Sequence, residues 1–291
     1  MKYTAANNDI LLNEYESFII SQTLECGQCF RFIRLGKENY LIVAYGRVLN
    51  ILQNGDSIVF KNTSEDDFNN IWVRYFDLDR SYRVIKEQIS FNDEVLQKAI
   101  AFAPGIRILN QDKFEGLISF IISQNSRIPR IKKVISNISK KYGNYICTYD
   151  GEDYYSFPTP EGLSKADEAG LTECRTGFRA KYIIDAVAKV LNGDIVLDAD
   201  DMSTDSLREM LMTIKGVGPK VADCTMLFSY GRCETFPTDV WVKRIMSQLY
   251  FAGADVNMKE IHKKAFDCFG EYAGYAQQYL FHYAREFKIG V

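Results

Sequence analysis

The most informative segment of this 291-residue chain is Ile214-Lys215-Gly216-Val217-Gly218-Pro219-Lys220. Two glycines around a single apolar residue predict a tight turn between two helices, where the backbone can come close to another molecule. Residues 221–228 have the composition of a second helix, and the free N–H groups of its first turn suit a phosphate. The stretch therefore predicts a helical hairpin near residues 207–228 with a phosphate-binding turn.

Lys220 stands at the start of that second helix, and Pro237-Thr238-Asp239 stands at the start of the next predicted helix. An amine nucleophile and a carboxylate beside a phosphate-binding turn indicate chemistry on the sugar of a nucleic acid. The simpler interpretation of Asp239 is a helix N-cap, and the two roles are compatible, because a carboxylate held by helix N–H groups stays ionised. Lys220 must lose its proton to attack, so we expect the two side chains to lie near each other without a tight ion pair.

Several other kinds of site do not fit the sequence. It has no phosphate-loop motif, and the helical spacing before the glycines argues against a dinucleotide fingerprint. With only two histidines and no spaced four-cysteine cluster, we expect no metal and no cofactor. The segment Cys26-Gly27-Gln28-Cys29 has redox-motif spacing but stands alone.

The composition predicts a globular protein, with 47% hydrophobic and 25% charged residues. No apolar run is long enough to cross a membrane, the N-terminus carries no secretion signal, and seven cysteines fit a reducing compartment. We therefore expect a cytoplasmic, monomeric prokaryotic protein. The net charge of −3 is unusual for a DNA-binding protein, but residues 105–141 carry eight basic and two acidic side chains. This basic stripe fits either a local nucleic-acid footprint or a solvated helix face.

The predicted fold class is α+β, mainly α. Strands are expected at 40–45, 48–52 and 57–60, with Asn54-Gly55 as a hairpin turn and one covering helix around 66–76. From about residue 92 onward the pattern is helical, with helices expected at 114–122, 131–141, 179–191, 205–213, 220–229, 240–250, 258–268 and 273–286. We predict an antiparallel β subdomain over 1–95 and a helical domain over 96–291.

Together these motifs resemble the 8-oxoguanine DNA glycosylase branch of the helix-hairpin-helix (HhH-GPD) superfamily, over nearly the whole chain. The resemblance rests on the hairpin, on the segments 24–31, 123–130 and 177–182, and on Val221-Ala222-Asp223-Cys224 after the lysine. It implies that Lys220 and Asp239 are catalytic. It implies 8-oxoguanine-binding roles for Gly27, Cys224, Pro237, Gln277 and Phe281, and opposite-base or DNA-binding roles for Asn125, Arg130, Phe178, Arg179, Gly216 and Gly218.

Several of these roles have a specific form in the family. The carbonyl of Gly27 would accept a hydrogen bond from N7–H, Phe178 would wedge the gap left in the duplex, and Arg179 would contact the orphaned cytosine. The residues themselves support a role for Gln277 and Phe281, which lie four positions apart on one helix face. The amide of Gln277 can bond to the Watson–Crick edge of an extruded base, and the ring of Phe281 can stack on its face. By the same criterion Phe281 and Cys224 also fit as ordinary core residues.

The chain departs from the family at three places: Phe178 stands where Tyr is frequent, Trp241 where eukaryotic members often have His, and Asn125-Ser126-Arg127 where asparagines often run. The resemblance implies a bifunctional enzyme that excises 8-oxoguanine opposite cytosine from double-stranded DNA through a lysine Schiff base and then cleaves the strand by β-elimination. Two alternatives remain open. One is a glycosylase of the same superfamily for another damaged base, and the other is a DNA-binding protein that keeps the hairpin without catalysis.

Overall fold

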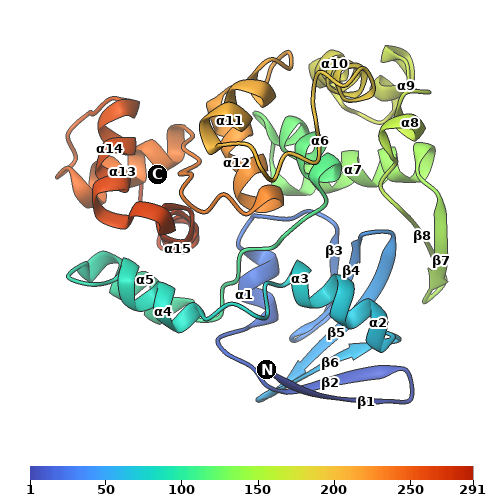
Figure 1. The fold of residues 1–291 in the computed structure, drawn as a ribbon, viewed down its shortest axis with the longest axis horizontal. Coiled ribbons are helices and arrows are strands. Elements are labelled where there is room, and N and C mark those ends of the chain that lie inside the picture. The colour runs from blue at the N-terminus through green and yellow to red at the C-terminus, as the bar shows by residue number, and fades with distance from the viewer. Residues whose placement is uncertain (291) are drawn as a thin grey trace.

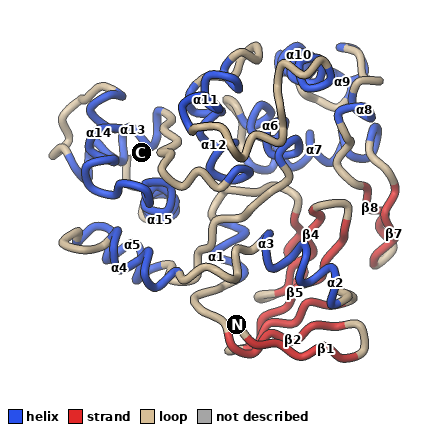
Figure 2. The backbone as a smooth tube through the Cα atoms, viewed as in Figure 1, coloured by secondary structure: helices blue, strands red, loops and turns tan. Residues whose placement is uncertain are grey.

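The computed structural model describes residues 1–290 and consists of a β-rich part and a larger helical part (Figures 1 and 2). The β-rich part is one antiparallel sheet with strand order β1-β2-β6-β5-β4-β3. Its strands are β1 (Lys2–Ala6), β2 (Asp9–Glu14), β3 (Phe32–Gly36), β4 (Asn39–Ala44), β5 (Arg47–Asn54) and β6 (Ser57–Lys61). The three predicted strands are confirmed as β4, β5 and β6, whereas β1, β2 and β3 were not individually predicted.

The hairpin between β5 and β6 forms where Asn54-Gly55 predicted it. Asn54 pairs with Ser57, and Gly55 takes the left-handed conformation with φ +55°, which favours glycine. Along β6 the buried residues alternate with half-buried ones, so that Ile58 and Phe60 face the core. This period of two is why a short apolar segment forms a strand covered on one face.

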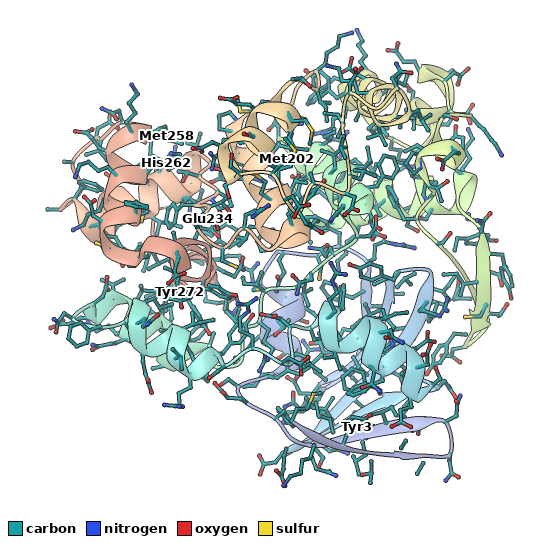
Figure 3. All side chains as sticks on the ribbon, viewed as in Figure 1. Tyr3, Met202, Glu234, Met258, His262 and Tyr272 are labelled. Carbon is teal, nitrogen blue, oxygen red and sulfur yellow. The ribbon has the colours of Figure 1, made fainter. Side chains whose placement is uncertain are left out.

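A helical segment covers that buried face of the sheet. It runs without a break through α2 (Glu65–Asp67), the π-helical η1 (Phe68–Trp72) and α3 (Val73–Tyr75), which confirms the covering helix predicted around 66–76. Phe68, Trp72 and Phe76 are fully or almost fully buried. Phe68 and Phe76 pack against Phe60, and Trp72 packs against Phe76. Tyr3 extends this cluster at the edge of the sheet, far from His262 in the helical part (Figure 3).

Helices make up most of the rest of the chain. Their bounds are α1 (Ile20–Glu25), α4 (Tyr82–Ile89), α5 (Glu94–Phe102), α6 (Lys113–Ser123), α7 (Ile128–Tyr142), α8 (Pro160–Leu163), α9 (Glu168–Glu173), η2 (Gly177–Arg179), α10 (Ala180–Leu191), α11 (Thr204–Met212), α12 (Pro219–Tyr230), α13 (Val240–Tyr250), α14 (Met258–Phe269), η3 (Gly270–Tyr272) and α15 (Ala273–Glu286). Every helix predicted after residue 113 is present, and its ends agree within a few residues. Within residues 1–290, no helix is long and apolar enough to span a membrane.

The helices α4 and α5 lie against the C-terminal helix α15 (Figure 1). Their buried residues Tyr82, Ile85 and Leu96 belong to the large helical core rather than to the core of the sheet. The boundary predicted at residue 95 falls inside α5. Residues 82–102 therefore pack with the C-terminal helix α15, although the two segments are distant in sequence.

The prediction of helix throughout the chain after residue 92 is wrong at one place. Strands β7 (Tyr145–Tyr149) and β8 (Glu152–Tyr155) form a separate hairpin that projects from the helical part (Figure 1). Its turn is Asp150-Gly151, with φ +50° and +80°, the backbone that a two-residue turn of this kind requires. The Asp150-Gly151 pair between two Tyr-rich segments is typical of a β-hairpin, and the prediction of helix did not take it into account.

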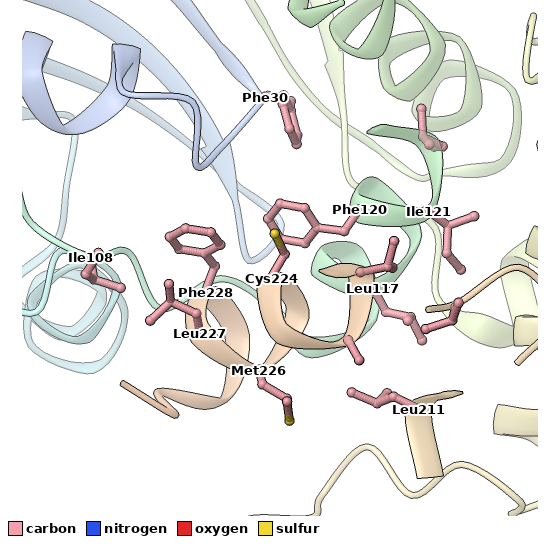
Figure 4. Close-up of a cluster of buried hydrophobic side chains, with 14 of the residues drawn as sticks. Phe30, Ile108, Leu117, Phe120, Ile121, Leu211, Cys224, Met226, Leu227 and Phe228 are labelled. Carbon is pink, nitrogen blue, oxygen red and sulfur yellow. The ribbon is translucent and has the colours of Figure 1, made fainter. Parts of the chain in front are cut away.

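The helices α6 and α12 pack against each other in the centre of the helical core. The ring of Phe120 on α6 stacks on the ring of Phe228 on α12, with centroids 5.5 Å apart and planes at 25°. Phe30, from the segment that enters the sheet, meets Phe120 edge-on at 6.0 Å (Figure 4). This aromatic group holds the segment at 26–30, which precedes β3, against the helical hairpin.

Candidate active site

The predicted helical hairpin is formed by α11, a turn at 213–218, and α12. Gly216 has φ +76°, and a Cβ at this position would lie 2.4 Å from the ring of Tyr182, so only glycine fits. Gly218 is the N-cap of α12 in extended backbone, with open space around its Cα, and Pro219 follows at the first helical position. Pro219 has no N–H, and the N–H groups of Val221 and Ala222 bond to the carbonyl of Gly218. The backbone N–H of Lys220 has no hydrogen-bond partner among residues 1–290, so this donor at the helix N-terminus can meet a phosphate.

A cavity of about 160 Å³ opens beside the start of α12. Its walls come from the segment before β3 and from α6, α7, α12, α13 and α15, segments that are distant in sequence. The lining includes every residue that was predicted to catalyse or to bind the damaged base: Gly27, Lys220, Cys224, Pro237, Asp239, Gln277 and Phe281. The structure thus brings together in one place the whole of this predicted set.

Lys220 and Asp239 line the cavity from the first turn of α12 and the N-cap of α13. The Nζ atom of Lys220 lies 5.8 Å from the centroid of the Phe120 ring. Asp239 accepts a hydrogen bond from the N–H of Val242 at 2.8 Å through Oδ1, so the N-cap role is confirmed. Among residues 1–290 no ion pair within 4.0 Å joins Lys220 to Asp239, in keeping with the expectation of proximity without tight pairing.

Gln277 supplies the polar group best suited to a ligand. It is 6% exposed, it lines the cavity, and its Oε1 atom has no hydrogen-bond partner in the structure. A buried acceptor without a donor costs about 1–3 kcal/mol, which a ligand donor would recover. The side chain is therefore poised for a group that enters the cavity.

Cys224 lies one turn after Lys220 on the same face of α12, where its thiol is directed toward the Phe120 ring (Figure 4). Burial raises the pKa of the Cys224 thiol, while the neighbouring Lys220 acts in the opposite direction. The thiol is thus a buried, soft contact surface at the wall of the cavity.

Phe281 stands across the cavity, close to Gly27. A Cβ on Gly27 would lie 3.2 Å from Cε1 of Phe281, and Gly27 has φ +95°. Glycine thus allows the backbone to approach the aromatic wall. Trp241 contacts Phe281 edge-on and donates its indole N–H to the carbonyl of Ile289 at 3.3 Å.

A second group of predicted residues lies at 124–130 and η2, outside the cavity. Asn125 is exposed with φ +46°, Arg130 is exposed, and the ring of Phe178 is 53% exposed beside Tyr182. These exposed side chains are accessible to a partner molecule. The wedge role predicted for Phe178 and the opposite-base contacts predicted for Asn125 and Arg130 require this exposure.

The contact with cytosine predicted for Arg179 stays a prediction, and in this structure the side chain bonds within the protein. It is 3% exposed, and its guanidinium donates to the carbonyls of Gln124, Asn125 and Thr176. These bonds use most of its donors, so a contact with a cytosine requires some of them to be released. In this structure Arg179 holds the loop that presents Asn125. Its burial arises because η2 packs under that loop, which the sequence pattern did not reveal.

Lys215, in the turn before Lys220, is 75% exposed and pairs with Asp185 at 3.4 Å. Cys26 and Cys29 are both free and fully buried, and burial raises the pKa of Cys26 to about 12. Their thiols are therefore protonated and unreactive.

The sequence did not predict four other residues that line the cavity. Phe30, Phe120 and Phe228 form its aromatic wall, and Gln278 lines it while donating to the carbonyl of Cys26 at 2.9 Å. The pair Gln277-Gln278 was visible in the sequence, but helical periodicity alone places only one of two adjacent residues on a given face.

Comparisons with known proteins agree with this geometry. Residues 10–117 match the family model of the 8-oxoguanine DNA glycosylase N-terminal domain, and residues 118–268 match that of the HhH-GPD superfamily base excision DNA repair proteins. The chain is 34% identical to an N-glycosylase/DNA lyase of Saccharomyces cerevisiae, covering 90% of this chain and 82% of the relative.

Two solved structures are similar over the whole length. One is the 8-oxoguanine glycosylase/lyase of Clostridium acetobutylicum in complex with double-stranded DNA containing cytosine opposite 8-oxoguanine, with a TM-score of 0.95, 43% identity and 99% of both chains covered. The other is MBOgg1 in complex with a low-affinity DNA ligand, with a TM-score of 0.95, 48% identity and 99% and 100% of the two chains covered. The chain belongs to the 8-oxoguanine DNA glycosylase branch of the HhH-GPD superfamily of base excision DNA repair proteins.

Proposed function

We propose that this protein is a bifunctional DNA repair enzyme that excises 8-oxoguanine opposite cytosine and then cleaves the DNA strand at the resulting site. The names of its relatives, N-glycosylase/DNA lyase and 8-oxoguanine glycosylase/lyase, support both activities. The seven free cysteines support a reducing, cytoplasmic setting for this work.

The main support for this function is the set of groups that line the cavity. Lys220 and Asp239 line the same cavity as Gln277, whose Oε1 atom is buried and without a partner. A non-catalytic DNA-binding hairpin has no use for a nucleophile, a carboxylate and an unsatisfied amide around one cavity. The cavity stands beside the phosphate-binding turn, so a nucleotide flipped from the duplex can place its base among these groups while its backbone stays at the hairpin.

The first chemical step exchanges one bond at the sugar for another. The deprotonated amine of Lys220 forms a bond to C1′, and the bond from C1′ to the base breaks, with its electron pair leaving on the base, which takes up a proton. Positive charge develops on the sugar ring during this step. The carboxylate of Asp239, fixed by the N–H of Val242 and free of an ion pair with Lys220, stabilises that charge.

The second step cleaves the strand. The lysine nitrogen loses its proton, the sugar ring opens, and a Schiff base links Lys220 to C1′. Removal of a proton from C2′ then expels the 3′ phosphate, which nicks the strand 3′ to the lesion. Both activities therefore depend on a single amine.

Recognition of the base is divided among the cavity walls. Gln277 offers an amide to the Watson–Crick edge, Cys224 and Phe281 enclose the ring faces, and the Gly27 carbonyl accepts from N7–H, which 8-oxoguanine has and guanine lacks. Pro237, directly before the Thr238-Asp239 pair, closes the wall beside Cys224. On the opposite strand, Phe178 fills the vacated space and the loop bearing Asn125 and Arg130 reads the cytosine.

The test is an assay on a duplex with one 8-oxoguanine opposite cytosine, with guanine at the same position as the control. We expect base release and strand cleavage on the first duplex only. Binding to both duplexes without cleavage would identify a DNA-binding protein instead. Excision from duplexes carrying an oxidised pyrimidine or an alkylated purine, with none from 8-oxoguanine, would identify a glycosylase for another base.

A further inference from the structure

The segment Glu25–Gln28 has an unequal pattern of hydrogen bonding at its carbonyl groups. The carbonyl of Glu25 accepts from Arg285 at 2.6 Å, that of Cys26 accepts from Gln278 at 2.9 Å, and that of Gln28 accepts from Gln111 at 2.8 Å. Within residues 1–290, no donor bonds to the carbonyl of Gly27. Side chains of the protein thus donate to the carbonyls of Glu25, Cys26 and Gln28, and the carbonyl of Gly27, which lines the cavity, is left without a donor.

Two of those three donors come from one stripe of α15. Gln278, Phe281 and Arg285 are spaced by three and four residues, so they share a face of the helix. Gln278 and Arg285 bond to the segment, and Phe281 between them touches the position of Gly27. The helix that supplies Gln277 to the cavity therefore also holds the two carbonyls that precede Gly27.

We propose that Gln278 and Arg285 are positioning residues for substrate specificity, which fix the Gly27 carbonyl as the acceptor that distinguishes 8-oxoguanine from guanine. This inference rests on the proposed function. The resemblance to the family gives a role to the Gly27 carbonyl but not to the residues that hold it. Here two side-chain donors bind the carbonyls of Glu25 and Cys26 and leave that of Gly27 for the ligand.

The discrimination needs such a device because it depends on a single atom. An N7–H donates to a carbonyl, whereas the bare N7 of guanine places a lone pair against it. Discrimination between the two bases by one hydrogen bond requires that the accepting carbonyl be held in a fixed position. A displacement of about 1 Å of such a group can reduce the rate by about 100-fold. Gly27 has φ +95°, and because glycine can adopt many backbone conformations, bonds to the neighbouring residues are needed to hold its carbonyl in one direction.

Base excision and strand cleavage separate this role from a general structural one. We expect Arg285→Leu and Gln278→Ala to lower single-turnover excision of 8-oxoguanine by about 10-fold more than they lower cleavage of a preformed abasic site, which presents no base to Gly27. Arg285→Lys, which keeps a donor near the Glu25 carbonyl, should recover part of the loss. Arg83→Leu, which removes a surface arginine paired with Glu87 on α4, is the matched control and should change neither rate.

A substrate change completes the test. In a duplex with 7-deaza-8-oxoguanine, carbon replaces N7 and the donor is gone, so wild-type excision falls and the Arg285 and Gln278 variants should lose little more. An equal loss in these variants on the normal and the 7-deaza substrate, or on excision and abasic-site cleavage, would overturn the proposal. Because each variant is compared with wild-type enzyme that excises 8-oxoguanine, a failure of the proposed function itself would show separately, as an inactive wild type.

Discussion

The indole of Trp241 packs edge-on against the ring of Phe281, with centroids 4.8 Å apart and planes at 71°. The indole N–H donates to the carbonyl of Ile289, so the C-terminal tail fixes the orientation of the tryptophan. The neighbouring Gly290 is held in turn by Gln248, which accepts its N–H at 2.9 Å. Trp241, at the position that often carries histidine in eukaryotic members, thus supports Phe281 at the wall of the cavity.

Removing this support should impair base excision. In Trp241→Ala the Phe281 ring loses its neighbour, and we expect kcat/KM for 8-oxoguanine excision to fall by about 10-fold, or about 1.4 kcal/mol of transition-state stabilisation. Trp241→Phe keeps an aromatic ring without the N–H and should lose less. Steady-state kinetics of the two variants measures the difference, and equal rates for Trp241→Ala and wild type would show that Phe281 needs no support.

The two functions of Asp239 can be separated by substitution. Asn is as good an N-cap as Asp, so Asp239→Asn should leave the free energy of unfolding within about 0.5 kcal/mol of wild type, whereas Asp239→Ala should lose about 1 kcal/mol. Both variants lack the negative charge, and we expect excision to fall by at least about 100-fold in each. Denaturant unfolding and single-turnover excision test this. Normal excision by Asp239→Asn would assign Asp239 to capping alone.

The two glycines of the hairpin should respond differently to alanine. Gly216→Ala combines φ +76° with a Cβ driven into the Tyr182 ring, and we expect a loss of about 2 kcal/mol or more in the free energy of unfolding. Gly218→Ala has extended backbone and open space, so its loss should stay within about 1 kcal/mol. Its Cβ instead meets an approaching phosphate, which should weaken DNA binding. A well-folded Gly218→Ala with unchanged affinity would place the phosphate elsewhere.

His282 should make stability depend on pH. It is buried on α15 beside Arg285 and Phe102, and burial, with the adjacent Arg285, lowers its pKa below the ordinary value of 6.5. The unfolded chain therefore takes up this proton at a higher pH than the folded chain. The free energy of unfolding should fall as the pH drops below 6.5, until the lowered pKa is passed.

Urea unfolding at pH 7.5 and pH 5.5 measures this dependence. The control is His282→Gln, which has no titrating group and should show a smaller fall between the two values. An identical fall in both proteins would mean that His282 keeps its ordinary pKa in the folded state.

The sequence predicted best what local chemistry determines. Regular apolar spacing located α10 to α15, and Asn54-Gly55 located the β5–β6 hairpin, because both signals depend on neighbouring residues. The Asp150-Gly151 hairpin carried a signal of the same kind that was not used. The pair Lys220 and Asp239 was indicated by the residues and their spacing, and the base-contacting set came from the family resemblance. The structure places both around one cavity.

Contacts between distant segments could not be predicted in this way. Gln278 meets Cys26 across 252 positions, and Arg285 meets Glu25 across 260. No local pattern relates such pairs, and the burial of Arg179 under the loop at 124–125 is likewise a consequence of tertiary packing. Family motifs indicate which residues touch a substrate, whereas the side chains that hold them in place become visible only in three dimensions.

Both proposed activities depend on a covalent bond between the amine of Lys220 and the sugar. Borohydride added during the reaction with an 8-oxoguanine duplex reduces the Schiff base to a stable link, and proteolysis with mass spectrometry then locates the modified residue. We expect one adduct, on Lys220, and none with Lys220→Gln. An adduct on another amine, or an undiminished adduct in Lys220→Gln, would contradict the mechanism.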